Sequence, residues 1–356
     1  MRPQVRADIA LREGYHSPQI DVDVRLNTNE APDAPPEGFH EALHTALDEV
    51  AWHRYPDRAA AALRARLAQR YGLDPSEVFV ANGSNEVLQT LLLTYGGGGR
   101  KTALFEPTFA MHGHISKTVG STVIEGDRAD DYSLDLDEVR RVVTEHSPEV
   151  LFLCSPNNPS GIVDPPGTVE EVLSIMDGTG GLLVVDEAYG QFADHSAVDL
   201  INDDTPLVVT RTFSKTWAMA GARLGYVLGP SWVIAELEKT VLPYHLDSFK
   251  QAAGIAALDF SDEMDERVEG IKGERERMIA ALGELPVTVW PSGANFFLFR
   301  ADDMSGQELW QALVDRSVLV RNCSNWPKIS ECLRVTVGAP EDNDRFLDAV
   351  TQILAP

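Results

Sequence analysis

Short apolar runs alternate along the middle of the chain with segments in which apolar residues recur at helical spacing. The runs predict five strands, at residues 78–81, 102–105, 150–154, 182–185 and 207–210. Strands that are apolar along their whole length and are joined by crossover helices are typical of a parallel sheet covered on both faces. The pattern therefore predicts an α/β fold.

The pattern changes after residue 242. A long stretch rich in Glu and Arg precedes four predicted strands and a closing helix, at 287–290, 296–299, 318–321, 333–337 and 342–354. This part is typical of a smaller α+β domain, whereas the first thirty residues show little regular pattern. We therefore expect an N-terminal arm at 1–30, a large domain at 31–247 and a small domain at 248–356 that completes the site.

The charge of the chain limits its partners. Its 356 residues include 30 basic and 55 acidic side chains, which gives a net charge of -25. This charge repels nucleic acid and anionic membrane surfaces, so neither is expected as a partner. An anionic substrate would need arginines placed at the site itself to overcome the overall field.

The cysteines and the N-terminus favour a cytoplasmic protein. Cys154, Cys323 and Cys332 are odd in number and form no C-x-x-C pair, which argues against a disulfide framework. The start lacks the apolar core of a signal peptide, and no apolar run is long enough to span a membrane. His112 and His114 have the spacing of a strand or turn without an accompanying carboxylate pattern, so no metal site is predicted.

Lys215 is the lysine that stands out among the seven in the chain. It follows a predicted strand directly and has Phe213, Trp217 and Met219 as neighbours in sequence. Apolar surroundings disfavour an ammonium and leave a neutral amine that can act as nucleophile and base. An arbitrary lysine is more often a surface residue with its stem along the protein, but these three neighbours favour a buried one.

Polar residues follow three other predicted strands. Asp186 ends a strand predicted to be buried on both faces, where open α/β sheets bind ligands; a helix N-cap is the alternative. The ring nitrogen of pyridoxal phosphate is a partner that would suit this carboxylate, with Tyr189 in reach of the ring hydroxyl. Asn158 lies between two prolines after the strand at 150–154. The 82–86 segment, between a strand and a helix, offers amides for a phosphate, although a simple N-cap fits it equally.

With these pieces in this order, the chain resembles the fold-type I aminotransferases and, within them, the histidinol-phosphate aminotransferase family. The resemblance covers nearly the whole length and implies a large domain with a mixed, mostly parallel sheet between helices, plus a small α+β domain. Seven segments carry it: residues 26–30, 54–57, 81–86, 155–161, 185–189, 211–225 and 333–338.

The resemblance implies pyridoxal 5'-phosphate as the cofactor. Lys215 would hold it as a Schiff base, Asp186 would pair with the ring nitrogen, and Asn158 and Tyr189 would bond the ring oxygen. Lys215, Asp186 and Tyr189 are the expected catalytic residues. Phe109 stands where the family usually stacks a tyrosine on the ring, so the stacking is kept and a hydroxyl is lost.

The same resemblance assigns the phosphate to a group of donors from several segments. These are the amides of Ser84 and Asn85, the side chains of Ser214 and Arg223, and Tyr55 of the neighbouring subunit. A residue contributed across the subunit boundary implies that the active unit is a homodimer.

On the substrate side, the resemblance implies that Arg334 and Arg321 bind anionic groups, with Asn29 nearby and Tyr15 of the arm closing over the substrate. Such residues would serve both the phosphate of histidinol phosphate and the carboxylates of glutamate. The implied activity is transfer of an amino group between L-histidinol phosphate and 2-oxoglutarate, in histidine biosynthesis.

Two departures from the family pattern keep an alternative open. Asn322 replaces a frequent aspartate, and residues 325–328 add bulk between the two arginines. An aromatic amino acid aminotransferase with Trp326 in its pocket would also fit. A catalytically silent binding protein of the same fold would have no use for Lys215. A nicotinamide dehydrogenase would need a G-x-G-x-x-G turn after a strand, which the sequence lacks.

Overall fold

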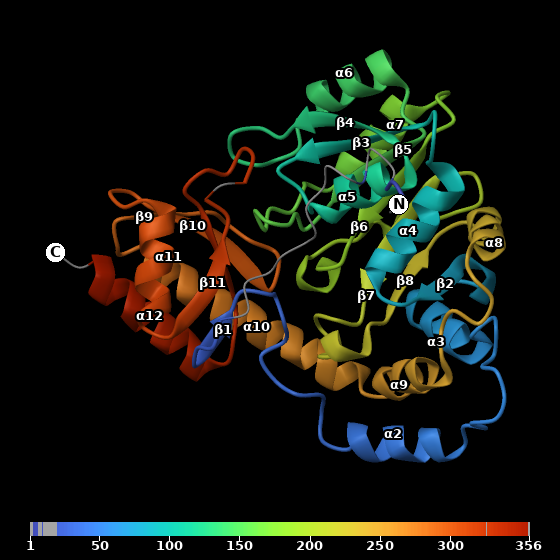
Figure 1. The fold of residues 1–356 in the computed structure, drawn as a ribbon, viewed down its shortest axis with the longest axis horizontal. Coiled ribbons are helices and arrows are strands. Elements are labelled where there is room, and N and C mark those ends of the chain that lie inside the picture. The colour runs from blue at the N-terminus through green and yellow to red at the C-terminus, as the bar shows by residue number, and fades with distance from the viewer. Residues whose placement is uncertain (1–2, 6–8, 10–19, 325, 355–356) are drawn as a thin grey trace.

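A seven-stranded sheet forms the centre of the larger part of the molecule (Figure 1). In the computed structural model, the described residues are 3–5, 9, 20–324 and 326–354. The strands of this sheet lie in the order β2 (Val78–Ala81), β8 (Gly225–Leu228), β7 (Leu207–Thr212), β6 (Leu182–Asp186), β5 (Val150–Cys154), β3 (Lys101–Glu106) and β4 (Thr122–Asp127). Strand β8 runs antiparallel to both of its neighbours, and the other six strands are parallel to one another.

Two apolar layers cover this sheet because successive side chains of a strand point to opposite faces. In β6, Leu183 and Val185 belong to one core, and Leu182 and Val184 belong to the other. The first core is closed by α3 (Ala61–Tyr71), α6 (Leu136–His146), α7 (Thr168–Met176) and α9 (Ser248–Leu258), and the second by α4 (Ser84–Tyr95), α5 (Met111–Val119) and α8 (Ser231–Thr240). Helix α2 (Phe39–Asp48) packs outside, against α9.

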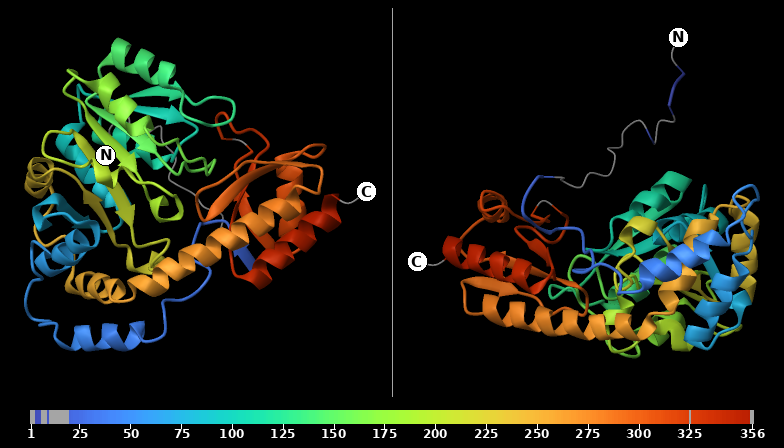
Figure 2. Two further views of the ribbon diagram at one scale, coloured as in Figure 1. Left: turned by 180° about the vertical axis from the view of Figure 1, so that it is seen from behind. Right: turned by 90° about the horizontal axis from the view of Figure 1, so that it is seen from below.

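The smaller part is built on a five-stranded sheet with three helices (Figure 2). Its strands lie in the order β1 (Val24–Leu26), β11 (Val318–Asn322), β12 (Leu333–Thr336), β10 (Phe296–Ala301) and β9 (Val287–Val289). Strand β1 pairs parallel with β11, and the other pairs are antiparallel. The helices are α10 (Ser261–Leu282), α11 (Gly306–Val314) and α12 (Pro340–Leu354), whose buried faces share a core with this sheet.

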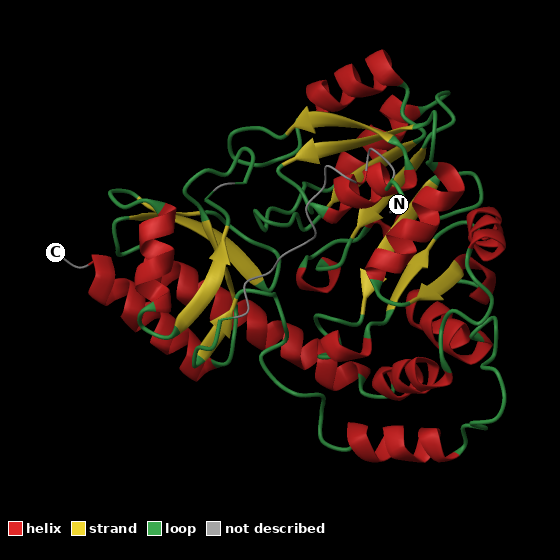
Figure 3. Cartoon of the chain, in the orientation of Figure 1, coloured by secondary structure: helices red, strands yellow, loops and turns green. Residues whose placement is uncertain are grey.

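The observed elements confirm the predicted α/β class and its smaller α+β companion (Figure 3). All nine predicted strands are present, but β1, β4 and β8 were not predicted. Within α10, Met264 packs in a core of the seven-stranded sheet, whereas Val268 packs in the core of the five-stranded sheet. Strand β1, from the N-terminal part of the chain, also pairs with the five-stranded sheet. The divisions at residues 30 and 248 therefore stay predictions. The spacing assigned to His112 and His114 was wrong, because both lie in helix α5.

Besides these elements, residues 20–324 contain four short 3-10 helices: η1 (Pro75–Glu77), η2 (Gly190–Phe192), η3 (Ala197–Leu200) and η4 (Ala220–Ala222). Among the residues that the structure describes, no helix is both long and apolar enough to cross a membrane. The feature that matters for the site is the shared edge at which the parallel strands β5, β6 and β7 end. Polar residues that follow these strands are brought together there.

Candidate active site

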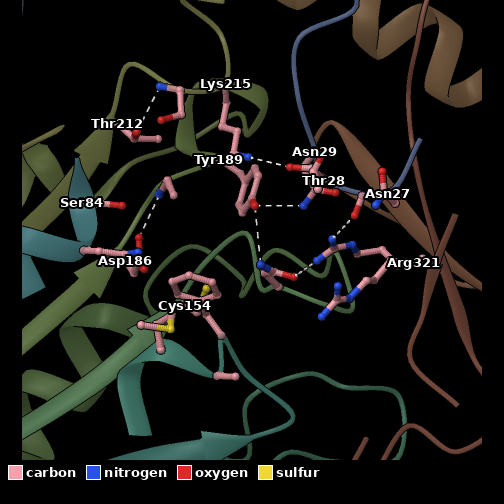
Figure 4. Close-up of a pocket in the computed structure, with 18 of the residues that line it drawn as sticks. Asn27, Thr28, Asn29, Ser84, Cys154, Asp186, Tyr189, Thr212, Lys215 and Arg321 are labelled. Atoms are coloured by element: carbon pink, nitrogen blue, oxygen red, sulfur yellow. Dashed lines mark hydrogen bonds between the residues drawn. The ribbon is translucent and has the colours of Figure 1, made fainter. Parts of the chain in front are cut away.

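A cavity of about 360 Å³ opens at this edge and is closed on its far side by the small domain (Figure 4). Twelve of the fourteen predicted site residues line it: Asn29, Ser84, Asn85, Phe109, Asn158, Asp186, Tyr189, Ser214, Lys215, Arg223, Arg321 and Arg334. Tyr55 lies on the surface with 80% of its area exposed, and Tyr15 lies outside the described residues. Cavities of this size are typical of sites for small molecules.

Lys215 enters the cavity from the turn after β7. The turn is held by Phe213 and Trp217, both completely buried, so the lysine stem rises from an apolar base. Its Nζ donates to the backbone oxygen of Thr28 at 3.0 Å. Burial, reinforced by the positive charge of Arg334, lowers the pKa of Lys215 to about 7. At neutral pH a large share of this amine is therefore uncharged and nucleophilic.

Asp186 ends β6 with its carboxylate held by three donors. Oδ1 accepts from Thr210 Oγ1 at 3.0 Å and from the amide of Ala188 at 3.1 Å, and Oδ2 lies 2.9 Å from His112 Nε2. His112 is completely buried and stacks on Phe152 at 4.6 Å between ring centroids. This carboxylate is thereby fixed in position at the wall of the cavity.

His112 contacts the candidate site, and sequence reasoning missed this contact. It was assigned an ordinary polar role, yet it is a direct partner of Asp186. The available signal was the helical spacing of residues 111–119, which places His112 in the first turn of a helix that begins just after Phe109. The contact itself joins residues 74 positions apart, so spacing alone could not reveal it.

The hydroxyl of Tyr189 is hydrogen-bonded to asparagines from two other segments of the chain. It accepts from Asn29 Nδ2 at 2.9 Å and from Asn158 Nδ2 at 3.5 Å. Burial raises the pKa of Tyr189 to about 12, so the hydroxyl keeps its proton at neutral pH and can donate it to a ligand oxygen. The Asn158 amide and the Tyr189 hydroxyl therefore form one hydrogen-bonding unit in the cavity wall.

The start of α4 and the Arg223 side chain form a candidate anion cradle. Arg223 Nη1 donates to Ser214 Oγ at 3.2 Å. A Cβ atom at Gly83 would lie only 2.8 Å from Arg223 Nη2, and one at Gly225 would lie 2.3 Å from the Ser84 amide nitrogen. Glycine is needed at 225 for this close approach to backbone, and at 83 because its φ is 79°. A helix N-terminus and a guanidinium that converge in this way suit a phosphate group.

Arg321 and Arg334 face the cavity from the small domain. They lie opposite each other in the register of β11 and β12, and both are nearly buried. Arg334 donates to Asn158 Oδ1 at 2.5 Å and to the backbone oxygen of Asn27 at 3.0 Å. The two guanidinium groups give this wall a positive charge within an acidic protein, which suits an anionic substrate group.

Asn322, which departs from the family pattern, does not line the cavity. Its Oδ1 accepts from the amide and the hydroxyl of Ser324, at 2.9 and 2.6 Å, and its Nδ2 donates to Gln307 Oε1 at 2.8 Å. This departure therefore shapes the loop after β11. Trp326, the other marked departure, does line the cavity.

The donors of the large-domain wall fit pyridoxal phosphate. The cradle of Arg223 and α4 suits a phosphate, the fixed carboxylate of Asp186 suits a protonated ring nitrogen, and the uncharged amine of Lys215 suits an aldehyde. These groups and the fold fit the class of fold-type I aminotransferases.

Comparison with known proteins agrees with this class. Residues 21–350 match the family model for aminotransferase class I and II. A histidinol-phosphate aminotransferase of Frankia casuarinae is 42% identical over 353 residues, covering 96% of this chain and 87% of the relative. One of Corynebacterium diphtheriae is 39% identical, covering 98% and 96%. The chain belongs to the class I and II aminotransferases and, within them, to the histidinol-phosphate aminotransferase family.

Solved structures share the same fold at lower identity. The histidinol-phosphate aminotransferase of Clostridium acetobutylicum aligns with a TM-score of 0.85 at 22% identity, covering 93% of this chain and 98% of that one. That of Sinorhizobium meliloti, solved in complex with pyridoxal-5'-phosphate, aligns with a TM-score of 0.81 at 23% identity, covering 93% and 91%. At these identities the likeness establishes the fold alone.

Proposed function

We propose that this aminotransferase moves an amino group between L-histidinol phosphate and 2-oxoglutarate, with pyridoxal phosphate held in the cavity. One observation carries the proposal: a single cavity holds the amine of Lys215, whose pKa is lowered to about 7, on one wall and the paired guanidinium groups of Arg321 and Arg334 on the other. The names of the relatives that are about 40% identical support histidinol phosphate as the amine.

In the proposed cofactor site, each residue would bind one part of the cofactor. Lys215 would anchor it, Asp186 would pair with the ring nitrogen, Asn158 and Tyr189 would bond the ring oxygen, and Phe109 would lie against the ring. The donors for the phosphate are the amides of Ser84 and Asn85 and the side chains of Ser214 and Arg223.

The proposed reaction depends on proton movement at Lys215 Nζ. Pyridoxal phosphate, when bound, supplies an electron sink that stabilises negative charge at the α-carbon of the substrate. Lys215 Nζ would accept the α-proton, which its lowered pKa of about 7 permits near neutral pH, and would hold it as an ammonium for delivery to the cofactor. Asp186, held by its three hydrogen-bonding partners, would present its carboxylate to the ring nitrogen.

The two arginines explain how one pocket would serve two unlike substrates. A phosphate and a carboxylate are both anionic groups with several acceptor oxygens, and guanidinium groups bind either through paired hydrogen bonds. Asn29, which bonds Tyr189 and lines the cavity, is proposed to contact the substrate on the same side.

We further propose a homodimer that places Tyr55 at the neighbouring site. Tyr55 stacks on Tyr244 at 4.6 Å between ring centroids, Trp52 contacts Phe249 at 4.8 Å, and these four side chains and Leu242 are all exposed. Exposed aromatic patches of this kind mark interfaces more often than free surface. Sedimentation velocity should find a dimer. The Tyr55→Phe variant should bind the cofactor more weakly but should remain a dimer. A monomer that binds the cofactor with full affinity would contradict this.

Trp326 in the cavity wall favours one alternative, an aromatic amino acid aminotransferase. Turnover of L-histidinol phosphate and of L-phenylalanine, each with 2-oxoglutarate, decides between the two. We expect kcat/KM to be larger for histidinol phosphate. A larger value for phenylalanine would replace the proposed substrate while leaving the aminotransferase class intact.

A further inference from the structure

Thr336 and Asn29 are joined by a pair of hydrogen bonds beside the hydroxyl of Tyr189. Thr336 lies on β12 of the small domain, and Asn29 belongs to the segment after β1, 307 positions away in the sequence. The backbone amide of Asn29 donates to Thr336 Oγ1 at 2.9 Å, and Thr336 Oγ1 donates to Asn29 Oδ1 at 3.1 Å. Both residues are buried, so their polar groups need partners within the protein.

The hydroxyl of Thr336 determines how the side-chain amide of Asn29 is turned. Thr336 Oγ1 accepts the backbone proton of Asn29 through a lone pair and donates its own proton to Asn29 Oδ1. With its carbonyl end bound in this way, the side chain directs its Nδ2 end to the Tyr189 hydroxyl, to which it donates at 2.9 Å. The opposite orientation would take this acceptor away from the buried Thr336 proton, which is unfavourable.

The backbone of Asn29 is also held by the small domain. Its oxygen accepts from Nδ2 of the completely buried Asn295 at 3.2 Å, and its φ of 54° lies in the left-handed region, which asparagine adopts more readily than most residues. With the backbone fixed on both sides, the main freedom left to Asn29 is rotation of its side chain. The bond to Thr336 restricts this rotation.

The orientation of the Asn29 amide sets the direction of the Tyr189 proton. Asn29 and Asn158 both present an N–H group to the Tyr189 oxygen, so the hydroxyl accepts in both contacts and its own proton is used in neither. An Asn29 side chain turned the other way would present Oδ1, and Tyr189 would donate its proton to that oxygen. The observed orientation therefore leaves the Tyr189 proton for a ligand.

We infer that Thr336 is a positioning residue, whose hydroxyl orients the side-chain amide of Asn29 and so leaves the Tyr189 proton for a ligand oxygen in the cavity. The inference rests on the proposed function in taking the ring oxygen of pyridoxal phosphate as this ligand oxygen. Thr336 does not line the cavity, so it acts through Asn29 and Tyr189, which do.

This role predicts an effect on the pKa of the bound cofactor. A donor on the ring oxygen stabilises the negative charge that this oxygen gains when the bound cofactor loses a proton, and so lowers the pKa of the bound cofactor. If Tyr189 donates to Asn29 instead, this stabilisation is lost and the pKa of the bound cofactor rises. A purely structural role of Thr336 would leave this pKa unchanged.

The first test is a pH titration of the enzyme loaded with pyridoxal phosphate, followed by the visible absorbance of the bound cofactor. Thr336→Val should raise the pKa of the bound cofactor by about 1, as expected for loss of a hydrogen bond to a charged group. Thr336→Ser keeps the hydroxyl and should leave this pKa unchanged. Because Thr336 acts through Asn29, adding Thr336→Val to Asn29→Ala should cause no further change beyond that of Asn29→Ala.

Asn343→Ala is the matched control for loss of stability. Asn343 is completely buried in the same domain, and its side chain bonds the amide and the oxygen of Gly338 at 2.8 and 2.9 Å. This variant should lower the melting temperature, as Thr336→Val should, without changing the pKa of the bound cofactor. The variants all retain the charged and titratable groups that face Tyr189: Lys215, Arg334, Asp186 and Cys154.

A second readout needs no cofactor. In the cofactor-free protein, hydrogen exchange of the Asn29 side-chain amide is followed by NMR, and its signals are assigned as those that Asn29→Ala lacks. Thr336→Val should accelerate this exchange about ten-fold, and Thr336→Ser should not. If the unaltered protein binds no pyridoxal phosphate, the proposed function fails, and the exchange rate alone then decides whether Thr336 positions Asn29.

Three results would overturn the inference. The first is a pKa of the bound cofactor in Thr336→Val that equals the value in Asn343→Ala. The second is unchanged exchange of the Asn29 side-chain amide in Thr336→Val, and the third is a further rise of the cofactor pKa when Thr336→Val is added to Asn29→Ala. If Thr336→Val does not fold, Thr336→Ala takes its place in the same comparisons.

Discussion

The two walls of the cavity are built in different ways. On the large-domain wall, Asp186 ends β6 and Lys215 follows β7, and every residue of these two strands is buried. On the small-domain wall, Arg321 and Arg334 lie on strands joined by a loop that carries Trp326. The groups proposed for cofactor chemistry thus sit on the most deeply packed part of the molecule, and those proposed for substrate recognition sit beside a loop.

The difference extends to how each wall is secured. Asp186 has three hydrogen-bonding partners, two of them buried side chains. The loop is tied to the large domain by an ion pair of Lys328 with Asp127 at 3.0 Å, and both of these side chains are more than half exposed. Exposed ion pairs contribute little stability. Packing of Ile329 and Cys332 with Tyr132 is therefore the main tie of this loop to the large domain.

The largest effect is expected on the large-domain wall. Replacing Lys215 by Ala removes the proposed anchor and the proton-transferring amine together, so kcat should fall by roughly 10⁴-fold or more. Lys239→Ala, at an exposed position of α8, is the control and should retain full activity. Steady-state turnover measures both. Full activity of Lys215→Ala would disprove the assignment of this wall.

A second test concerns the pKa of Lys215 in the cofactor-free protein. Burial lowers this pKa from an ordinary 10.5 to about 7, so the neutral fraction at pH 7 is roughly 10³ times that of an exposed lysine. Acetylation by acetic anhydride, followed by peptide mass spectrometry, should show a rate at Lys215 that levels off above pH 8. The rate at Lys239 should keep rising to pH 10. Parallel pH profiles for the two lysines would contradict the lowered pKa.

The arginines test the small-domain wall. Arg334 bonds Asn158 and the backbone of Asn27, so it also links the two walls. Arg334→Ala should lower kcat/KM for both amino donors, L-histidinol phosphate and L-glutamate, by roughly 30- to 1000-fold, as expected for loss of a buried charged contact. Arg321→Ala should have a smaller effect. Arg334→Lys keeps the positive charge but loses the paired N–H donors of the guanidinium, so its kcat/KM should lie between the values of Arg334→Ala and the unaltered enzyme. A loss of kcat/KM for only one of the two amino donors would contradict the shared anion site.

The smallest effect is expected for a substitution of His112, which lies behind Asp186 on the large-domain wall. His112→Leu removes one partner of the Asp186 carboxylate, and bonds to charged groups are worth about 1.5–3 kcal/mol. Affinity for pyridoxal phosphate, measured by titration of the cofactor-free protein, should fall roughly 10- to 100-fold. His114→Leu is the control two positions along the same helix. Equal losses in the two variants would indicate a general effect on α5.

The central sheet was predictable from sequence because its buried strands are apolar along nearly their whole length. Strand β6 has five consecutive buried residues, and a short apolar run of this kind is typical of a strand covered on both faces. Strand β4 escaped prediction because it lies at the edge and half of its residues are exposed. Strand β8 has only four residues and directly follows a turn, and β1 has three.

The site was predictable where residues follow strands along the chain, as Asp186, Asn158 and Lys215 do. Contacts between distant segments were not predictable from the sequence, because two such segments are brought together only by the folded arrangement of the chain. Thr28 offers its backbone oxygen to Lys215 across 187 positions, and no side-chain pattern encodes such a contact. The bond of Arg334 to Asn158, across 176 positions, is a further example.

The most direct test of the central claim is to locate the cofactor's covalent attachment. The enzyme loaded with pyridoxal phosphate is reduced with sodium borohydride, which makes the bond between the lysine and the cofactor permanent, and its peptides are then mapped by mass spectrometry. We predict that the cofactor is found on the peptide containing Lys215 and on that residue alone. Attachment at any of the other six lysines, or at none, would contradict the account.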